Sequence, residues 1–274
     1  MTPSRSALGG PRLIGLPYDA SSSFLQGPAD APPLIRAALG SPASNSWAHG
    51  LRDVLGSGGL TDAGDLTLPP RSEARATIEA GVDEVLAGGW RPIALGGDHS
   101  VTYPAVRAVA RVHGPLTILH VDAHPDLYDV FEGDRFSHAC PFARIMEEGL
   151  AARLVQVGIR TMNRHQREQA DRFGVEVIDM SAWLAGGRPR LDGQVYLSVD
   201  LDGLDPAYAP GVSHREPGGL ATREVIAMVQ ELGGALVAAD VVEYNPDRDV
   251  AEITATVAAK IVKEIAGRMM AEAE

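Results

Sequence analysis

Short apolar segments alternate with segments of helical periodicity along almost the whole chain. Segments such as 116–121 (LTILHV) and 195–199 (VYLSV) are apolar at nearly every position, which is typical of strands buried on both faces of a parallel sheet. Segment 72–86 instead repeats apolar residues at helical spacing and ends at two glycines. The alternation predicts an α/β fold with helices on both faces of the sheet.

The expected elements extend from residue 12 to the C-terminus. Strands are expected at 12–17, 92–95, 116–121, 154–159, 175–178, 195–199 and 235–242, and helices at 31–39, 72–86, 101–112, 141–153, 164–173, 222–232 and from 249 to the end. No composition break, internal repeat or low-complexity segment divides this series. We therefore expect one domain over 1–274, a three-layer αβα architecture with a parallel, doubly wound central sheet.

Composition narrows the class of protein. Hydrophobic residues make up 45% of the chain and charged residues 22%, which is ordinary for a soluble globular protein. The net charge of -12 argues against nucleic acid or an anionic membrane as partner. The single cysteine, Cys140, excludes an intrachain disulfide and a thiolate metal cluster. Since segment 1–10 lacks an apolar stretch of signal-peptide length, we expect a cytoplasmic protein.

Polar residues follow four of the expected strands at the point where each strand ends. GGDHS follows 92–95, DAHPD follows 116–121, DLD follows 195–199 and EYNP follows 235–242. The carboxyl ends of parallel strands meet at one edge of a sheet, where ligands bind in open α/β folds. These polar side chains are therefore expected to converge.

Residue spacing indicates which side chains point the same way. In an extended chain residues two apart share a face, so Asp122, His124 and Asp126 project together, as do Asp200 and Asp202. Converging carboxylates cannot all stay ionised in a site of low dielectric without a compensating cation. Two divalent cations would balance them. Oxygen and imidazole donors without thiolate suit manganese better than structural zinc, with nickel, cobalt or iron as alternatives.

Three of these polar segments, with their flanking residues, also resemble the motifs of a known family. GGDHS at 96–100, DAHPD at 122–126 and SVDLDGLDP at 198–206 resemble the signature motifs of the ureohydrolases, the arginase–agmatinase family. Segments 21–36, 126–149, 209–220 and 240–246 resemble plant-type arginases more closely than animal ones. The resemblance implies an arginase-like fold, hydrolysis of a guanidino group to release urea, and assembly as a homotrimer or homohexamer.

The resemblance also implies a ligand set for two metal ions, usually Mn²⁺. One ion would be held by His99, Asp122, Asp126 and Asp200. The other would be held by His124, Asp122, Asp200 and Asp202, so that Asp122 and Asp200 bridge the two.

Two catalytic residues are carried over from the family in the same way. Glu243 matches the glutamate that pairs with the substrate guanidinium, since a carboxylate can accept two parallel hydrogen bonds from that planar group. His138 matches the histidine proposed as proton shuttle, a task that suits imidazole because its pKa lies near neutrality. A nucleophilic pair of His138 with Cys140 is the less favoured interpretation. His120 is expected to be a hydrogen-bonded core histidine.

The small-molecule guanidino substrate is less well defined by the sequence. L-Arginine is the first expectation, with agmatine or another ω-guanidino acid as the alternative. The pocket is expected to be walled by the loops 129–137, 163–165 and 213–216, with 19–23 at its mouth. The expected substrate-binding residues lie in the three wall loops: Asp134, Arg135, Asn163, Ser213 and His214. Plant-type members carry an asparagine in place of Asp134 and an aromatic residue in place of Arg135.

Three rival classes remain open. A metallophosphoesterase would need an Asn-His-Asp/Glu element, which the sequence does not contain. A deacetylase-like zinc amidohydrolase would use one metal and need no second Asp-X-Asp. A non-enzymatic homologue predicts the loss of at least one ligand position, whereas each position is intact.

Overall fold

The computed structural model of the chain describes residues 9–70 and 72–273. The greater part of segment 1–10, used above to predict a cytoplasmic location, therefore lies outside the described residues. Within the described residues no helix is both long and apolar enough to cross a membrane.

The centre of the fold is an eight-stranded sheet whose strand pairs are all parallel. Its strand order is β4-β1-β5-β10-β9-β6-β7-β8. The strands are β1 (Pro11–Leu16), β4 (Thr61–Asp65), β5 (Arg91–Gly96), β6 (Leu116–Val121), β7 (Ala151–Val157), β8 (Glu176–Ile178), β9 (Gln194–Asp200) and β10 (Ala235–Val242). A separate hairpin pairs β2 (Trp47–Ala48) with β3 (Arg52–Asp53).

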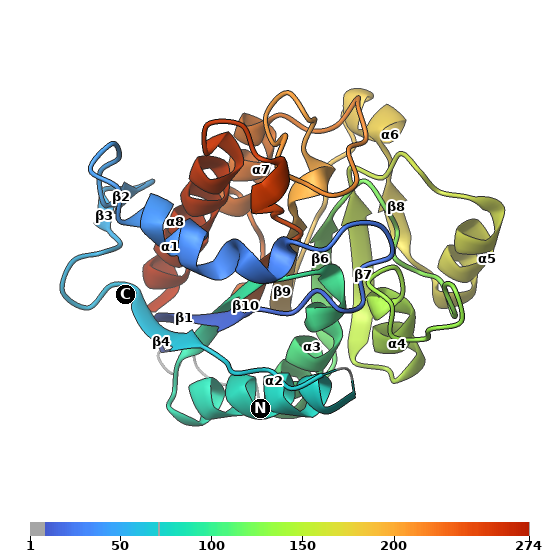
Figure 1. Cartoon of the computed structure of the whole chain (residues 1–274), viewed down its shortest axis with the longest axis horizontal. Coiled ribbons are helices and arrows are strands. Elements are labelled where there is room, and N and C mark those ends of the chain that lie inside the picture. Colours follow the sequence, from blue (N-terminus) through green and yellow to red (C-terminus); the bar gives the residue numbers. More distant parts are fainter. Residues whose placement is uncertain (1–8, 71, 274) are drawn as a thin grey trace.

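Helices cover both faces of the sheet, as expected for a three-layer fold (Figure 1). One layer contains α1, α7 and α8, and the other contains α2, α3 and α4. The helices are α1 (Ala31–Leu39), α2 (Ser72–Ala87), α3 (Thr102–His113), α4 (Pro141–Glu147), α5 (Arg164–Phe173), α6 (Met180–Leu184), α7 (Thr222–Gln230) and α8 (Ile253–Ala273).

The central strands are buried because both of their faces pack against a helical layer. In β5, Ile93 and Leu95 belong to the apolar cluster on the side of α1 and α8, whereas Ala94 belongs to the cluster on the side of α2 and α3. This alternation explains why these strands read as continuous apolar segments in the sequence. The predicted α/β class and parallel sheet are confirmed.

Several predicted boundaries were wrong. The helix expected over 141–153 ends at Glu147, since Gly149 adopts a left-handed backbone (φ 65°) and β7 already begins at Ala151. The last helix begins at Ile253 rather than at 249, because the Asp249 carboxylate accepts backbone N–H groups of the first helical turn. The sequence pattern also missed β4, β2, β3 and α6, which are short or lie at the sheet edge or surface.

The strand order places the carboxyl ends of four predicted strands side by side. Strands β5, β10, β9 and β6 are consecutive neighbours at the middle of the sheet. The chain passes from β5 to β6 across the two positions that β10 and β9 later fill. The polar segments that follow these four strands therefore share one crevice, at the place where open α/β sheets bind ligands.

Candidate metal centre and substrate pocket

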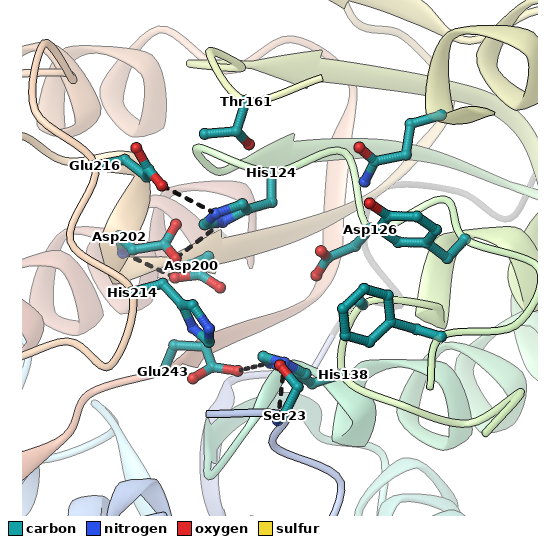
Figure 2. A pocket seen from close by; sticks show the side chains of 14 residues that line it. Ser23, His124, Asp126, His138, Thr161, Asp200, Asp202, His214, Glu216 and Glu243 are labelled. Atoms are coloured by element: carbon teal, nitrogen blue, oxygen red, sulfur yellow. Dashed lines mark hydrogen bonds and ion pairs between the residues drawn. The ribbon is translucent and has the colours of Figure 1, made fainter. Parts of the chain in front are cut away.

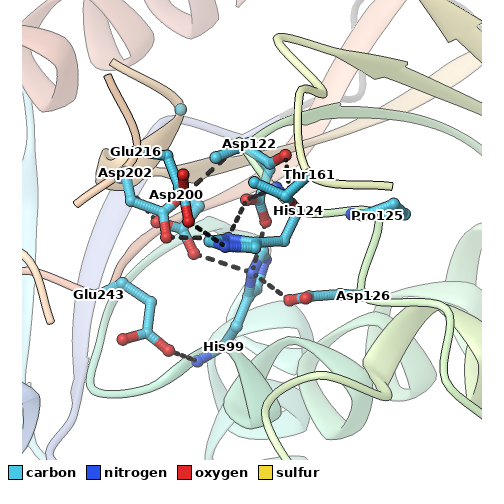
Figure 3. A network of polar contacts seen from close by, with 12 residues as sticks. His99, Asp122, His124, Pro125, Asp126, Thr161, Asp200, Asp202, Glu216 and Glu243 are labelled. Carbon is cyan, nitrogen blue, oxygen red and sulfur yellow. Dashed lines mark hydrogen bonds and ion pairs between the residues drawn. The ribbon is translucent and has the colours of Figure 1, made fainter. Parts of the chain in front are cut away.

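The imidazole of His99 lies at the centre of three carboxylates. Its Nδ1 is 3.2 Å from Asp122 Oδ2, 3.0 Å from Asp126 Oδ2 and 3.1 Å from Asp200 Oδ2 (Figure 3). This nitrogen is buried and makes no hydrogen bond among the described residues. Three carboxylate oxygens and one imidazole nitrogen therefore converge on one position, and the nitrogen forms no hydrogen bond with these oxygens.

The other ring nitrogen shows which way His99 carries its proton. Ser198 donates its hydroxyl hydrogen to Asp240 Oδ1 at 2.6 Å, so the contact of 3.0 Å between Ser198 Oγ and His99 Nε2 needs an N–H on the imidazole. A neutral His99 then directs the lone pair of Nδ1 at the three carboxylates. Such an arrangement fits a divalent cation at this position.

A second cluster lies next to the first. His124 Nδ1 is 3.1 Å from Asp202 Oδ2 and 3.4 Å from Asp122 Oδ1. Asp122 thus presents one oxygen to each cluster, which is the bridging geometry predicted for it. Asp200 directs Oδ2 to the first cluster while its Oδ1 accepts the backbone N–H of Asp202 at 2.8 Å, so its own bridging role stays a prediction.

The electrostatics of these carboxylates also fit bound cations. Burial raises the pKa of Asp200 well above its ordinary value, and the charges of Asp202 and Asp122 add to this rise. Burial and the charge of Asp122 raise the pKa of Asp202 to about 7, although His124 acts in the opposite direction. Divalent cations would replace protons in neutralising this buried charge. The donors, all oxygen or imidazole, fit two hard or borderline divalent ions.

His120 holds the Asp122 carboxylate in place. Its Nε2 lies 2.7 Å from Asp122 Oδ2, and its Nδ1 lies 3.0 Å from the amide nitrogen of Gln156. The buried ring stacks on Phe142 at a centroid distance of 3.9 Å. The prediction of a hydrogen-bonded core histidine is confirmed, and the contact fixes the orientation of a predicted ligand.

Glu243 lies beside the clusters on a left-handed backbone (φ 63°), which is costly for a residue other than glycine. Its Oε1 accepts the backbone N–H of His99 at 2.9 Å and also lies 2.9 Å from His138 Nδ1. Burial acts to raise the pKa of Glu243, but the charge and hydrogen bond of His138 outweigh it, so the pKa is lowered. An ionised carboxylate therefore forms part of the wall beside the clusters.

A pocket of about 260 Å³ opens over these residues (Figure 2). It is lined by Ser23, His124, Asp126, Tyr128, Phe131, His138, Ala139, Thr161, Gln166, Asp200, Asp202, His214, Glu216 and Glu243. The predicted catalytic pair and four predicted ligands thus share one pocket wall, while His99 and Asp122 lie buried beneath it.

The predicted substrate-binding residues are distributed differently. His214 lines the pocket, whereas Asp134 lines a neighbouring cavity. Arg135 lies outside the lining and its guanidinium pairs with Glu147 at 2.9 Å. The structure does not bring Asp134 and Arg135 to the metal clusters.

The other two residues of that set have local structural contacts. Asn163 caps helix α5, and its Nδ2 donates to the hydroxyl of Tyr128, which does line the pocket. Ser213 is buried, and its hydroxyl oxygen accepts from Asn245 Nδ2 at 2.9 Å. Asn163 therefore lies behind a residue that lines the pocket, and Ser213 is buried in the loop that carries His214.

Sequence reasoning missed several lining residues. Glu216 lies in the expected wall loop 213–216 but was not among the predicted binding residues, and its carboxylate lies 3.9 Å from His124 Nε2 at the pocket margin. It follows His214 by two residues, a spacing that could have indicated a shared face of the loop. Thr161 and Gln166 belong to no motif and gave no such signal, and Tyr128 lies in the segment 126–149 without a role assigned to it.

The alternative nucleophilic pair of His138 and Cys140 does not occur. The Cys140 thiol is buried and donates to the carbonyl of Asp134, and burial raises its pKa to about 12. Both imidazole nitrogens of His138 contact other groups, Glu243 and Ser23. A thiolate nucleophile has no support in this geometry.

Comparison with known proteins agrees with this geometry. The model of the arginase family matches residues 11–267. The mitochondrial arginase 1 of Arabidopsis thaliana is 47% identical over 281 residues, which cover 94% of this chain and 80% of that protein. The solved structure of an arginase from Medicago truncatula has a TM-score of 0.90 at 44% identity, covering 96% of this chain and 88% of that one. An agmatine ureohydrolase of Thermoplasma volcanium has a TM-score of 0.83 at 31% identity, covering 98% and 92%.

Proposed function

Because the chain belongs to the arginase family, we propose that it converts L-arginine to L-ornithine and urea with two Mn²⁺ ions bound. Plant arginases such as that of Arabidopsis thaliana, which is 47% identical to this chain, support arginase-type hydrolysis that releases urea. The observation that carries the proposal is the unpartnered, buried Nδ1 of His99 among three carboxylate oxygens.

Each cluster supplies the ligands for one ion. His99, Asp122, Asp126 and Asp200 would hold the first ion. His124, Asp122 and Asp202, with Asp200, would hold the second. When bound, two such ions lower the pKa of a shared water and so provide a nucleophile at neutral pH. Nickel, cobalt or iron could occupy the same donors, and manganese is the proposal because hard oxygen ligands predominate.

Glu243 and His138 act on the guanidinium group. The ionised Glu243 carboxylate lies in the pocket wall and can accept N–H groups from the planar substrate, which orients the carbon toward the clusters. His138 Nδ1 lies 2.9 Å from the same carboxylate. An amine that leaves from a guanidinium held by Glu243 is therefore within reach of the imidazole proton.

The distal part of the pocket would hold the tail of the substrate. Glu216 offers an acceptor for an α-ammonium group, while Tyr128, Thr161, Gln166 and His214 are polar neighbours for a carboxylate. Arginine is favoured over agmatine by the higher identity to plant arginases. Agmatine is the second candidate, because the lining contains an acidic Glu216 and, among the described residues, neither lysine nor arginine.

The experiment is a urea-release assay on manganese-loaded protein with L-arginine, agmatine and 4-guanidinobutyrate in parallel. The proposal expects the largest kcat/KM for L-arginine. A larger kcat/KM for agmatine would reject arginine as substrate while keeping the hydrolytic centre. No urea from any of the three compounds, with both metals bound, would reject the proposed activity.

We further propose a cytoplasmic homotrimer or homohexamer that binds neither nucleic acid nor membrane. The acidic net charge of -12 supports the absence of polyanionic partners. Light scattering coupled to size exclusion would test the assembly, since a monomer or dimer would contradict it. Cell fractionation would test the location.

A further inference from the structure

Ser23 forms the wall between two cavities. It lines the substrate pocket and also a second, larger cavity of about 620 Å³. The second cavity is polar: three consecutive serines, 21–23, line it together with Ser72, Ser137 and Arg75. Ser23 and Phe131 are the lining residues that the two cavities share among the described residues. A substrate in the first cavity would leave the second one accessible to water.

Ser23 contacts the side of His138 that faces away from Glu243. The backbone N–H of Ser23 donates to His138 Nε2 at 3.2 Å, and the Ser23 hydroxyl lies 2.8 Å from the same nitrogen (Figure 2). A backbone N–H can only donate, so Nε2 must offer a lone pair. The neutral His138 therefore carries its proton on Nδ1, toward Glu243, and its Nε2 toward an exposed serine hydroxyl.

The loop that carries Ser23 is held against His138 by two further bonds. The backbone N–H of Ser21 donates to Asp98 Oδ2 at 3.0 Å, and the backbone N–H of His138 donates to the carbonyl of Ser21 at 3.1 Å. Backbone hydrogen bonds therefore position both the loop of Ser23 and the loop of His138 for this contact.

We propose that the Ser23 hydroxyl and the second cavity form a proton path between solvent and His138, separate from the route that the substrate takes. The proposal rests on the proposed hydrolysis of a guanidino substrate. It assigns a function to the second cavity and a role to Ser23 as a positioning and relay residue.

The proton steps balance. The amine that leaves takes the proton of His138 Nδ1. His138 Nε2 takes the hydroxyl proton of Ser23, and Ser23 Oγ takes one from water in the second cavity. After the products leave, the next water to enter the pocket loses one proton, which enters at the vacated Nδ1 while the proton on Nε2 returns through Ser23 to solvent. One proton leaves and one arrives in each turnover, and both His138 and Ser23 end as they began.

Charged groups around His138 influence this exchange from several elements. Glu243 follows β10, Asp98 follows β5, Asp126 follows β6, and the His214 ring lies at a centroid distance of 5.3 Å. Burial acts to lower the pKa of His138, but Glu243 and the two aspartates outweigh it and raise the pKa to about 9. The Ser23 N–H instead favours the neutral form of His138, so Ser23 and Glu243 have opposite effects on the pKa of the imidazole.

The test compares Ser23→Ala with Ser23→Thr and with Ser22→Ala. Ser23→Ala keeps the backbone N–H and removes only the hydroxyl. We expect kcat to fall about tenfold with little change in KM, because a relay is lost while the shuttle remains. Small buffers such as imidazole should restore kcat as their concentration rises. Ser23→Thr keeps a hydroxyl and should retain most of kcat.

Ser22→Ala is the matched control, since it removes a neighbouring hydroxyl that contacts Asp98 at 3.3 Å and not His138. It should keep kcat within about twofold, the effect ordinary for a surface substitution. A fall in kcat for Ser23→Ala that no buffer restores, or one matched by Ser22→Ala, would overturn the relay. An unchanged kcat would overturn it as well.

A second readout is independent of turnover. In protein labelled with ¹⁵N at histidine and held above about pH 9, where His138 is neutral, the His138 signals, assigned with His138→Asn, should report a protonated Nδ1 and an unprotonated Nε2. The opposite tautomer would contradict the proposed path. Wild-type protein that releases no urea would instead reject the proposed function, so the two failures remain distinguishable.

Discussion

The metal-binding half of the pocket and its distal half are built in different ways. The metal-binding half comes from residues at or just after the ends of three buried strands, β5, β6 and β9. In the sheet β9 and β6 are neighbours, and β10 separates β9 from β5. The distal half comes from loops, through residues such as Tyr128, Thr161 and Glu216. Positions on strand ends follow the spacing of the sequence, because the sheet fixes where each residue points. Positions on loops do not, since each loop adopts its own conformation.

Because of this difference, we expect Asp122, the predicted bridging carboxylate, to be the position most sensitive to substitution. Asp122→Asn removes a charge that both clusters share, at a site whose residues lie at or just after strand ends. We expect loss of both metals and a fall in kcat/KM of at least about 10³-fold. Metal analysis of the purified variant, together with urea release, measures both effects. A variant with two metals and full activity would show that Asp122 is not the bridge.

Glu243→Gln tests the guanidinium contact without changing the clusters. The amide keeps an oxygen for the backbone N–H of His99 but loses the charge that pairs with substrate. We expect kcat/KM to fall about 10²–10³-fold while the metal content stays at the wild-type value. Equal loss of metal would indicate a structural or ligand role for Glu243 instead.

His138→Asn tests the proton shuttle. The replacement removes the group that lies between Glu243 and Ser23, neither of which is a predicted metal ligand. We expect kcat to fall about 10²-fold with KM nearly unchanged. Metal content is the control here: its loss would place His138 among the ligands.

Removal of metal should make stability depend on pH. Burial, with the charge of a neighbouring carboxylate, raises the pKa of Asp98 and of Asp202 to about 7 each. Between about pH 4 and 7 the folded state binds more protons at these groups than the unfolded chain does, so the free energy of unfolding falls as pH rises. Lowered pKa values have the opposite sign: those of Asp122 and Glu243 act near and below about pH 4, and those of His120 and His214 act below about pH 6.5. The raised pKa of His138 adds to the fall above about pH 6.5.

The measurement is Tm by calorimetry, with chelator and with Mn²⁺, between pH 5 and 8. In chelator Tm should fall by about 5 °C across this range, and Mn²⁺ should remove most of the fall. A Tm that rises with pH in chelator would mean that these carboxylates are not the groups that need neutralising.

The smallest effects are expected at the distal half of the pocket. Glu216→Gln should raise KM for L-arginine about tenfold, because an acceptor for the α-ammonium group loses its charge. Arg135→Ala should leave kcat/KM within about twofold, since its guanidinium pairs with Glu147 on the surface. A larger loss at Arg135 than at Glu216 would mean that the loop over 129–137 closes on the substrate.

The sequence predicts much of this molecule for identifiable reasons. Buried strands in β5, β6, β9 and β10 are apolar at nearly every position, and the polar residue after each strand marks the site. Asp122 and His124 could be placed on one side because residues two apart share a face. The helix expected over 141–153 passed through Gly149, because the apolar spacing that persists beyond this residue was given more weight than the glycine, which is itself a signal for a helix C-terminus.

The contacts that sequence reasoning missed join segments that are far apart in the chain or depend on how a loop turns. Ser23 and His138 are 115 residues apart, and no motif joins them. Arg135 was a reasonable candidate for a substrate carboxylate by charge and loop, but the loop turns its guanidinium toward Glu147. Charge type alone does not determine direction in a loop.

The most direct test of the two clusters is an anomalous difference map at the manganese edge from crystals grown with Mn²⁺. Two peaks are expected, one beside His99 Nδ1 and one beside His124 Nδ1, both in contact with Asp122. A single peak, or peaks that lie away from these two nitrogens, would contradict the metal centre on which the proposed hydrolysis depends.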